Sequence, residues 1–564
     1  MCLFPLLRKR KRKKSSAPLE GPSSVLYIQD GGPKIIIIGA GAAGLACAMK
    51  LLDNGFTHVR ILEAENRIGG RILTIPFGNN VIDLGAQFCH GEEDNIVYEM
   101  LSNLDLLETS ASVYNKYDCI RSNGEVLSQD VTEALKSAIA SIFDDPIEAG
   151  PHESFSEYLR ERFFQIIDGK ENVSKRVAEE FFENFKRVES SETAFGIEEA
   201  SAKGVIEYWI CPGDYMLNFR NRGYISFLRV LIESSDDQFL GKMENRIKFN
   251  CTVEQIEWGQ PNGKATVKCN NENITFEADH VIVTASLGVL KERADTLFVP
   301  ALPLQKKRAI VALGYTGTCK IFLEFPQRFW PEDWTGFTTL WRKQDIDKLR
   351  RSKWAWLEEI FGFYCVNYQP RVLLGWIVGP YVLKIESLAR DVIQMGCMKL
   401  LRRFLHSWLI PEPIAICVTN WHSNPNFRGA YSFRSMLTEE LGVSAEQLAD
   451  PLVVVMDNQK CHDGSDSDST SKKSETTFIK PVVQFAGEAT SCHYYSTVHG
   501  AVESGFREAD LSRSRIGDIM TILKALAHSC NILVVGPFAA SSANSHHGNF
   551  SRVQKAKGMA VNEK

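Results

Sequence analysis

The sequence lacks the features that mark disulfide-rich, metal-dependent and membrane-spanning proteins. Its 14 cysteines are scattered over 564 residues with no CxxC pair and no metal-ligand spacing, which is typical of a reduced intracellular protein. No apolar run reaches the length that crosses a bilayer. No signal peptide is predicted, because the basic run follows the short apolar start instead of preceding it. We expect a cytoplasmic protein without a metal ion and without a membrane partner.

The charge is unevenly distributed. The run from Arg8 to Lys14 carries seven positive charges, and without them the net charge falls from −5 to −12. An acidic body attracts cationic substrates and repels nucleic acid, so no nucleic-acid partner is expected. The basic run itself leaves three interpretations open: a nuclear import signal, a contact with an anionic surface, or a solvated disordered leader. The C-terminal tripeptide Asn562-Glu563-Lys564 does not resemble a peroxisomal address.

A chain of this length suits two or three domains. The pattern predicts an α/β fold, in which a Rossmann-like nucleotide-binding domain is interleaved with an α+β substrate domain of mixed sheet covered by helices. We assign 33–105, 225–300 and 411–512 to the first domain, and 106–224 and 301–410 to the second. Residues 1–32 are predicted to be a disordered leader, 462–476 a mobile low-complexity insertion, and 513–564 a partly disordered tail.

Hydrophobic periodicity places the main elements. Continuous β-branched runs predict buried strands, and apolar residues three and four apart predict helices, which dominate from about 100 to 220. The predicted helices are Ala42–Leu52, Val177–Val188 and Val392–Trp408. The predicted strands are Ile35–Ile38, Val59–Glu63, Cys251–Trp258, Ala265–Cys269, Ile274–Thr284, Lys320–Phe325, Val372–Val378 and one beginning in Cys417–Trp421.

A glycine motif follows the first predicted strand. Gly39, Gly41 and Gly44 form the spacing GxGxxG at the start of a helix, which permits a tight turn, close backbone approach to a pyrophosphate and close helix–strand packing. Glu63 ends the second strand, where a carboxylate binds ribose hydroxyls. The next glycine pair and arginine, Gly69-Gly70-Arg71, add backbone and a guanidinium beside the phosphates, which favours FAD over NAD.

Several blocks together resemble the flavin-containing amine oxidase family, and most of all its polyamine oxidase branch. The N-terminal blocks are IIIIGAGAAGLACA at 35–48, ILEAENRIGGRI at 61–72 and DLGAQFCHG at 83–91. The later blocks are HVIVTASLGVLK at 280–291, TGTCKIFLEFPQRFW at 316–330, WHSNPNFRGAYS at 421–432 and QFAGEATSCHYYSTVHGAVESGFREAD at 484–510. They occur in the order of the family and frame residues 30 to 510.

The resemblance implies an amine oxidase fold and a set of cofactor contacts. Glu488 would meet the ribityl–phosphate region of FAD, Val253 the adenine end, and the pair Thr497-Val498 the flavin ring. With the residues already named, the implied FAD site comprises Gly39, Ala40, Gly41, Gly44, Glu63, Ala64, Gly70, Arg71, Gly85, Ala86, Val253, Gly487, Glu488, Thr497 and Val498. Because the turn at Arg428-Gly-Ala-Tyr-Ser has no cysteine, where monoamine oxidases attach flavin covalently, we expect non-covalent FAD.

The resemblance also implies the catalytic and substrate-binding residues. Lys320 matches the lysine that holds a water against flavin N5, although a strand-end lysine is more often solvated. His90 matches a histidine near the substrate amine, where a neutral imidazole could select or deprotonate a polyamine nitrogen. Tyr431 and Tyr495 match the aromatic walls before the flavin. The substrate set is completed by Thr497, Val498, and the carboxylates Glu189 and Glu192, which would follow a helix and pair with distal ammonium groups.

Two positions depart from the family. Val498 replaces a threonine in the common Ser-Thr-Thr-His, and Ser491-Cys492 replaces a His-Arg pair, which affects substrate preference more than FAD binding. The expected function is oxidation of spermine or N1-acetylated polyamines with molecular oxygen by a monomer, giving an aldehyde, a shorter amine and hydrogen peroxide. The alternatives are a histone lysine demethylase of the same superfamily, a monoamine oxidase, and a flavin-binding protein without turnover.

Overall fold

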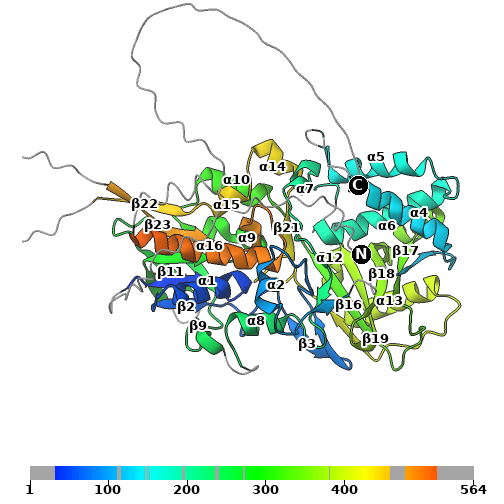
Figure 1. Cartoon of the computed structure of the whole chain (residues 1–564), viewed down its shortest axis with the longest axis horizontal. Helices are drawn as coiled ribbons and strands as arrows, with labels where there is room; N and C mark the ends of the chain where they lie inside the picture. Colours follow the sequence, from blue (N-terminus) through cyan, green and yellow to red (C-terminus); the bar gives the residue numbers. More distant parts are fainter. Residues whose placement is uncertain are drawn as a thin grey trace, which may run out of the picture. The chain divides into compact units, whose positions relative to one another are not determined.

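The computed structural model describes most of the chain between residues 32 and 517. The described ranges are 32–110, 116–144, 147–148, 150, 153–193, 197–235, 240–270, 274–379, 381–457 and 477–517. The predicted leader up to residue 31, the predicted insertion and nearly all of the predicted tail lie outside these ranges. Two six-stranded sheets and their covering helices dominate the described chain (Figure 1). No helix within it is long and apolar enough to cross a membrane.

The first sheet gathers strands from all three segments assigned to nucleotide binding. Its order is β22-β23-β13-β1-β2-β9, and β1 pairs in parallel with both β2 and β13. This arrangement confirms the predicted parallel strand at Ile35–Ile38. The strands are β1 (Ile35–Ile38), β2 (Val59–Leu62), β9 (Ile247–Lys248), β13 (His280–Val283), β22 (Leu452–Asp457) and β23 (Thr477–Phe485).

Both faces of this sheet are covered. Ile35 and Ile37 belong to one apolar core, whereas Ile36 belongs to another on the opposite face, as the alternation of side chains along a strand requires. Burying each such side chain contributes about 1.5–3 kcal/mol. The first core contains residues of three helices: α1 (Ala42–Asp53), α8 (Ile225–Leu231) and α16 (Val498–Gly517). The second core contains residues of two helices, α9 (Leu287–Leu297) and α10 (Leu304–Ala312). It also contains residues of three strands: β10 (Val253–Glu257), β11 (Ala265–Cys269) and β12 (Thr275–Ala278).

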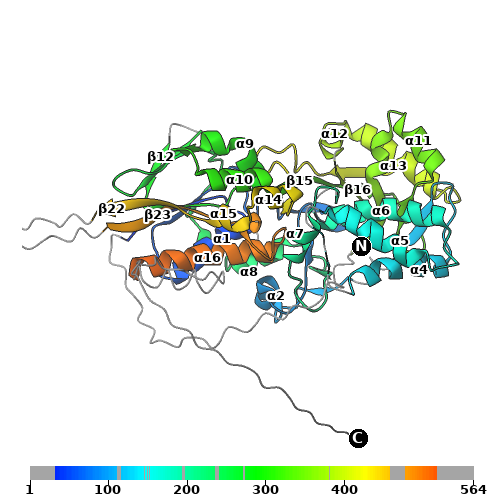
Figure 2. The same ribbon diagram turned by 90° about the horizontal axis from the view of Figure 1, so that it is seen from above.

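Helices from the two ends of the chain lie side by side on the first face. α1 and α16 run next to each other in both views (Figure 1, Figure 2). A Cβ atom at Gly505 of α16 would lie 2.3 Å from the Ala43 carbonyl oxygen of α1, so only glycine permits this approach. The close packing brings the N-terminus of α16 near the glycine loop that follows β1.

The second sheet has the order β20-β16-β19-β18-β17-β7. Helices α4 (Gln129–Ile142), α5 (Phe155–Ile167) and α6 (Lys175–Thr193) pack in one core beside it, and α13 (Arg390–Phe404) packs in another. All its pairs are antiparallel except β7 with β17. Its strands are β7 (Asp118–Arg121), β16 (Thr318–Glu324), β17 (Gly336–Leu340), β18 (Ile360–Val366), β19 (Gln369–Val378) and β20 (Ala415–Val418).

Several predicted elements differ in extent from the structure. The strand predicted over Ile274–Thr284 is two strands, because β12 pairs with β11 and then, after Asp279, β13 joins β1 in another sheet. The helix predicted over Val392–Trp408 runs from Arg390 to Phe404. The strand predicted to begin in Cys417–Trp421 is β20, which starts earlier and ends at Val418. Beyond it the Thr419 N–H still donates to the Lys320 carbonyl at 3.1 Å, but the Thr419 side chain, and not its backbone, accepts the Lys320 N–H.

Some segments assigned to nucleotide binding serve the second sheet. β20 lies within 411–512, yet it pairs with β16. The hairpin of β3 (Thr74–Phe77) and β4 (Asn80–Asp83) lies within 33–105, yet Ile82 packs in a core with Phe322 of β16. Apolar periodicity does not reveal these exchanges, because it reports that a face is buried and not which sheet buries it.

Candidate active site

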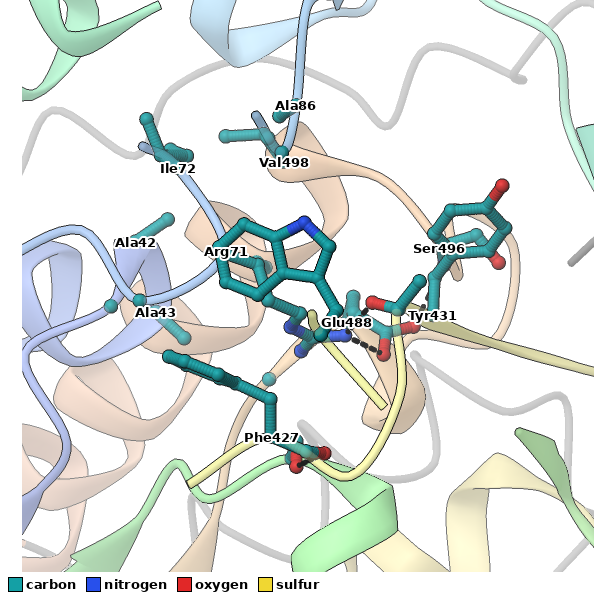
Figure 3. A pocket seen from close by; sticks show the side chains of 18 of the residues that line it. Ala42, Ala43, Arg71, Ile72, Ala86, Phe427, Tyr431, Glu488, Ser496 and Val498 are labelled. Atoms are coloured by element: carbon teal, nitrogen blue, oxygen red, sulfur yellow. Dashed lines mark hydrogen bonds and ion pairs between the residues drawn. The ribbon is translucent and has the colours of Figure 1, made fainter. Parts of the chain in front are cut away.

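A large cavity is lined by residues from both sheets. On the first sheet it opens where β1, β2 and β13 end, at Ile38, Leu62 and Thr284. Ligands of parallel α/β sheets bind at this carboxyl edge. On the second sheet it is lined by Lys320 of β16 and Trp376 of β19, which are paired in register. Figure 3 shows part of the wall, with Ala42 and Ala43 on one side and Tyr431 on another.

The glycine loops form a cradle that side chains would fill. Gly39 has a φ of +105°, which favours glycine, and a Cβ at Gly44 would lie 2.0 Å from the Gly39 carbonyl oxygen. A Cβ at Gly70 would lie 3.2 Å from the Cα of Gly41, so two bare backbones meet at the cavity wall. Gly41 precedes α1, and within the described chain no side chain caps this helix. The free N–H groups and the helix dipole fit a pyrophosphate.

Glu63 directly follows β2 and lies in the cavity wall. Its carboxylate accepts the Ala40 N–H at 2.6 Å and the Glu65 N–H at 2.8 Å, which fixes it beside the glycine loop. Burial raises its pKa above the ordinary value, although both N–H groups oppose the shift. Ala64 and Val253 also line the cavity, whereas Ala40 contributes through its backbone N–H to Glu63. The position fits a carboxylate that binds ribose hydroxyls.

An ion pair joins the two distant motifs across the cavity. Arg71 Nη1 lies 2.9 Å from Glu488 Oε1 and donates to the Ala430 carbonyl at 2.6 Å. The other carboxylate oxygen of Glu488 accepts the Ser432 hydroxyl at 2.6 Å and the Ser496 N–H at 2.9 Å. The dashed lines in Figure 3 mark contacts of this group. The pair belongs to the cavity wall, as do Gly85, Ala86, Gly487, Thr497 and Val498.

Lys320 is buried in the wall, with only 3% of its surface exposed. Its Nζ donates to the carbonyls of Asp83 and Gly85 at 2.9 and 2.8 Å and to Gln87 Oε1 at 2.9 Å. It also lies 4.6 Å from the centre of the Trp376 ring. Burial lowers the Lys320 pKa to about 7, and the Asp83 carboxyl opposes the shift. The amine is therefore close to balance between its charged and neutral forms near neutral pH.

His90 is held as one neutral tautomer. Its Nδ1 lies 2.9 Å from the Tyr215 carbonyl oxygen, which can only accept, so Nδ1 carries the proton. Nε2 is then an acceptor. Burial lowers the His90 pKa to about 4, and the hydrogen bond to Tyr215 only partly opposes this. The ring also packs on the Tyr215 ring, with centroids 4.4 Å apart, and His90 lines the cavity.

Aromatic side chains line much of the remaining wall. Tyr431 donates its hydroxyl to the Ser191 carbonyl at 2.6 Å and accepts from Thr318. The Tyr495 ring meets the edge of Tyr208 at 5.2 Å. Tyr431 and Tyr495 were predicted from the sequence, whereas four further lining residues were not: Tyr208, Trp376, Trp421 and Gln87. The blocks at 83–91 and 421–432 contained Gln87 and Trp421, but no spacing pointed to them.

The prediction that Glu189 and Glu192 follow a helix is wrong. Both positions lie inside α6, and Glu189 is only 1% exposed. Among the described residues that line the cavity, α6 contributes Ser191 and not Glu189. The helix continues because the apolar face marked by Val188 packs into a core with Tyr364 of the second sheet. The Glu192 side chain lies outside what the structure describes.

The glycine cradle at the carboxyl edge of a parallel sheet, beside a cavity that reaches a second sheet, is the arrangement of a dinucleotide-binding protein. The family model for flavin containing amine oxidoreductase matches residues 42–511. The chain belongs to this family, and its cofactor is FAD, which the glycine cradle, Glu63 and Arg71 would hold.

Curated relatives and solved structures agree with the family. The chain is 28% identical over 510 residues to the peroxisomal N(1)-acetyl-spermine/spermidine oxidase of Homo sapiens, covering 85% of this chain and 94% of that one. It is 28% identical to probable polyamine oxidase 5 of Arabidopsis thaliana, covering 85% and 97%. A putrescine oxidase structure with bound putrescine matches with a TM-score of 0.58 at 18% identity, over 85% of this chain and 98% of that one, and supports the fold.

Non-covalent attachment of FAD is the first testable prediction. The turn at Arg428-Gly-Ala-Tyr-Ser has no cysteine that could form a covalent link, and its Ala430 carbonyl accepts a hydrogen bond from Arg71. We expect acid precipitation of the purified protein to release all of its flavin into the supernatant. Absorbance of the supernatant and of the redissolved pellet measures the two fractions. Yellow colour that stays with the precipitated protein would contradict the prediction.

Proposed function

We propose that this protein oxidises polyamines, with spermine, N1-acetylated polyamines or both as substrates. One observation carries the proposal. On the wall of an aromatic cavity, burial lowers the pKa of His90 to about 4 and the pKa of Lys320 to about 7. An amine substrate must lose its proton before its α-carbon can be oxidised, and the neutral His90 imidazole on the cavity wall can accept the N–H of that neutral amine. The polyamine oxidases among the relatives support the same substrate class.

FAD held by the glycine cradle, Glu63 and Arg71 would supply the redox chemistry, which is acceptance of a hydride from the α-carbon of the amine and reduction of oxygen to hydrogen peroxide. The protein supplies orientation and protonation state. His90 Nε2 accepts the N–H of the substrate amine, since Nδ1 is committed to Tyr215. A group with a pKa of about 4 does not retain a proton near neutral pH, so His90 orients the amine rather than storing its proton.

Lys320 takes up a proton from water during hydrolysis of the imine. When its amine is neutral, it has two N–H groups for three acceptors, and its lone pair can take a proton from water. A water that gives up this proton attacks the oxidised imine carbon, and the product separates into an aldehyde and a shorter amine. The walls of Tyr431, Tyr495 and Trp376 exclude bulk water and pack against the methylene groups of the chain.

The test is peroxide production by the purified flavoprotein. Hydrogen peroxide is measured with spermine, spermidine, N1-acetylspermine and a methyl-lysine peptide, with catalase as the control for the signal. We expect turnover with at least one of the three polyamines. Peroxide with the methyl-lysine peptide alone would favour the demethylase alternative. No peroxide with any polyamine, together with no bleaching of the flavin by spermine without oxygen, would contradict the proposal.

A further inference from the structure

Two cysteine thiols meet behind the nucleotide end of the cavity. The Sγ atoms of Cys251 and Cys269 lie 3.0 Å apart, and both side chains are buried, at 1% and 6% exposure. Cys251 precedes β10 and Cys269 ends β11, and these strands pair antiparallel with Val253 opposite Cys269. A disulfide requires a separation of about 2.05 Å, so a movement of about 1 Å brings the two sulfurs to bonding distance.

The pair adjoins the FAD site on one side. Cys251 lines the cavity together with Thr252 and Val253, so a molecule as small as hydrogen peroxide can reach it from within. The Cys251 N–H donates to the Glu63 carbonyl at 2.8 Å, and the Thr252 carbonyl accepts from Asn270 at 3.0 Å. The segment that carries the thiol is therefore bonded to the backbone of Glu63, and it includes Val253 of the cavity wall.

We propose that Cys251 and Cys269 form a reversible peroxide-sensitive dithiol, and that their disulfide weakens the binding of FAD. The proposal rests on the proposed function only for the source of the peroxide. In the first step one thiol sulfur attacks the peroxide O–O bond, giving a sulfenic acid and one water. In the second step the other thiol attacks that sulfur, its S–H proton leaves with the displaced hydroxide, and a second water and the S–S bond form. Two thiols are oxidised and one peroxide is reduced.

The surroundings assign different parts to the two thiols. Burial, reinforced by the contact with Cys251, raises the pKa of the Cys269 thiol to about 12, which disfavours its reactive thiolate. Cys251 lines the cavity, so it is the thiol that peroxide meets first, and Cys269 is the partner that closes the disulfide. Contraction of the pair moves the Cys251 backbone against its bond to Glu63, and losing one such bond weakens FAD binding about tenfold.

Peptide mapping of the peroxide-treated holoenzyme tests the site without any substrate. Wild-type protein is exposed to added hydrogen peroxide, alkylated, digested and analysed by mass spectrometry, and free flavin is followed by fluorescence. We expect a Cys251–Cys269 cross-linked peptide that lacks two hydrogens, release of FAD in step with it, and reversal of both by dithiothreitol. No cross-link, or a cross-link that leaves FAD retention unchanged, would overturn the proposal. Because the peroxide is added, this result does not depend on amine oxidation.

Matched variants separate the pair from other thiols. Cys251→Ala and Cys269→Ala should each retain FAD through the same peroxide treatment, whereas Cys417→Ala, a partly exposed cysteine outside the cavity wall, should release it like the wild type. FAD release that persists in both pair variants would overturn the proposal, even if either variant proves less stable. In a final experiment, spermine turnover replaces the added peroxide, with and without catalase. If catalase abolishes the cross-link, then the oxidant is the hydrogen peroxide that the enzyme itself produces.

Discussion

Replacing Lys320 by methionine should lower kcat with spermine by a factor on the order of 10² to 10⁴, which is the usual contribution of a group that transfers protons, while FAD stays bound. The amine lies on the cavity wall over Trp376, and its pKa of about 7 lets it exchange a proton near neutral pH. Methionine preserves the apolar stem but can neither give nor take a proton. Steady-state kinetics and the flavin spectrum of the purified variant measure the two effects.

The same lysine also ties the cavity wall together, so a second variant is needed. Its three contacts fix Asp83, Gly85 and Gln87, the segment that leads to His90. Lys320→Gln can still donate to these acceptors, but it cannot ionise. If Lys320→Gln recovers most of the activity, then the contacts matter and proton transfer does not, which would contradict the assigned role.

Lys306 provides the matched control. It is also 3% exposed, burial lowers its pKa to about 7, and it donates to the carbonyls of Gln447 and Leu448. It does not belong to the described cavity wall. Lys306→Met should therefore keep its kcat, although its melting temperature falls. The pH profile gives a further criterion: a transition of kcat near pH 7 should be present in wild type and Lys306→Met and absent in Lys320→Met.

Local chemistry made part of this site predictable from the sequence. Gly39, Gly41 and Gly44 predict a phosphate loop because a side chain at these positions would interfere with the turn, the cofactor or the helix packing. The structure shows close backbone contacts at these glycines, as the spacing predicts. The four isoleucines of β1 likewise indicate a strand covered on both faces. These features depend on residues close together in the sequence, and so a pattern is sufficient to reveal them.

Long-range pairing made the rest unpredictable. Trp376 faces Lys320 only because β19 pairs with β16 in one register, and nothing in either strand fixes that register beforehand. The helix α6 was expected to end before Glu189, yet its apolar face finds a core in the second sheet and the helix continues. The Cys251–Cys269 contact arises in the same way, from a strand pairing and its irregularity near Val253. In each case the decisive partner lies far along the chain.

The second large effect, on FAD affinity, is expected at the Arg71–Glu488 ion pair. This pair joins the N-terminal and C-terminal motifs of the sequence. Arg71→Met should weaken FAD binding roughly a hundredfold, since breaking a buried ion pair costs about 3–5 kcal/mol and Arg71 is a quarter exposed, which favours the lower end of that range. The variant weakens FAD binding because of charge. It removes the cation near the glycine cradle, which attracts the cofactor phosphates, and it leaves the Glu488 carboxylate without its counter-ion, which repels them.

Loss of charge balance and simple loss of packing predict different FAD affinities for a double variant. Arg71→Met with Glu488→Gln removes the stranded negative charge, so the double variant should bind FAD more tightly than Arg71→Met alone. Titration of the apoproteins with FAD, followed by flavin fluorescence, measures each affinity. Arg67→Met is the control, because Arg67 has nearly the same side-chain exposure, 24% against 25%, but pairs with Glu65 instead. If the double variant binds no better than Arg71→Met, then the pair acts by shaping the wall and not by balancing the charge that FAD must meet.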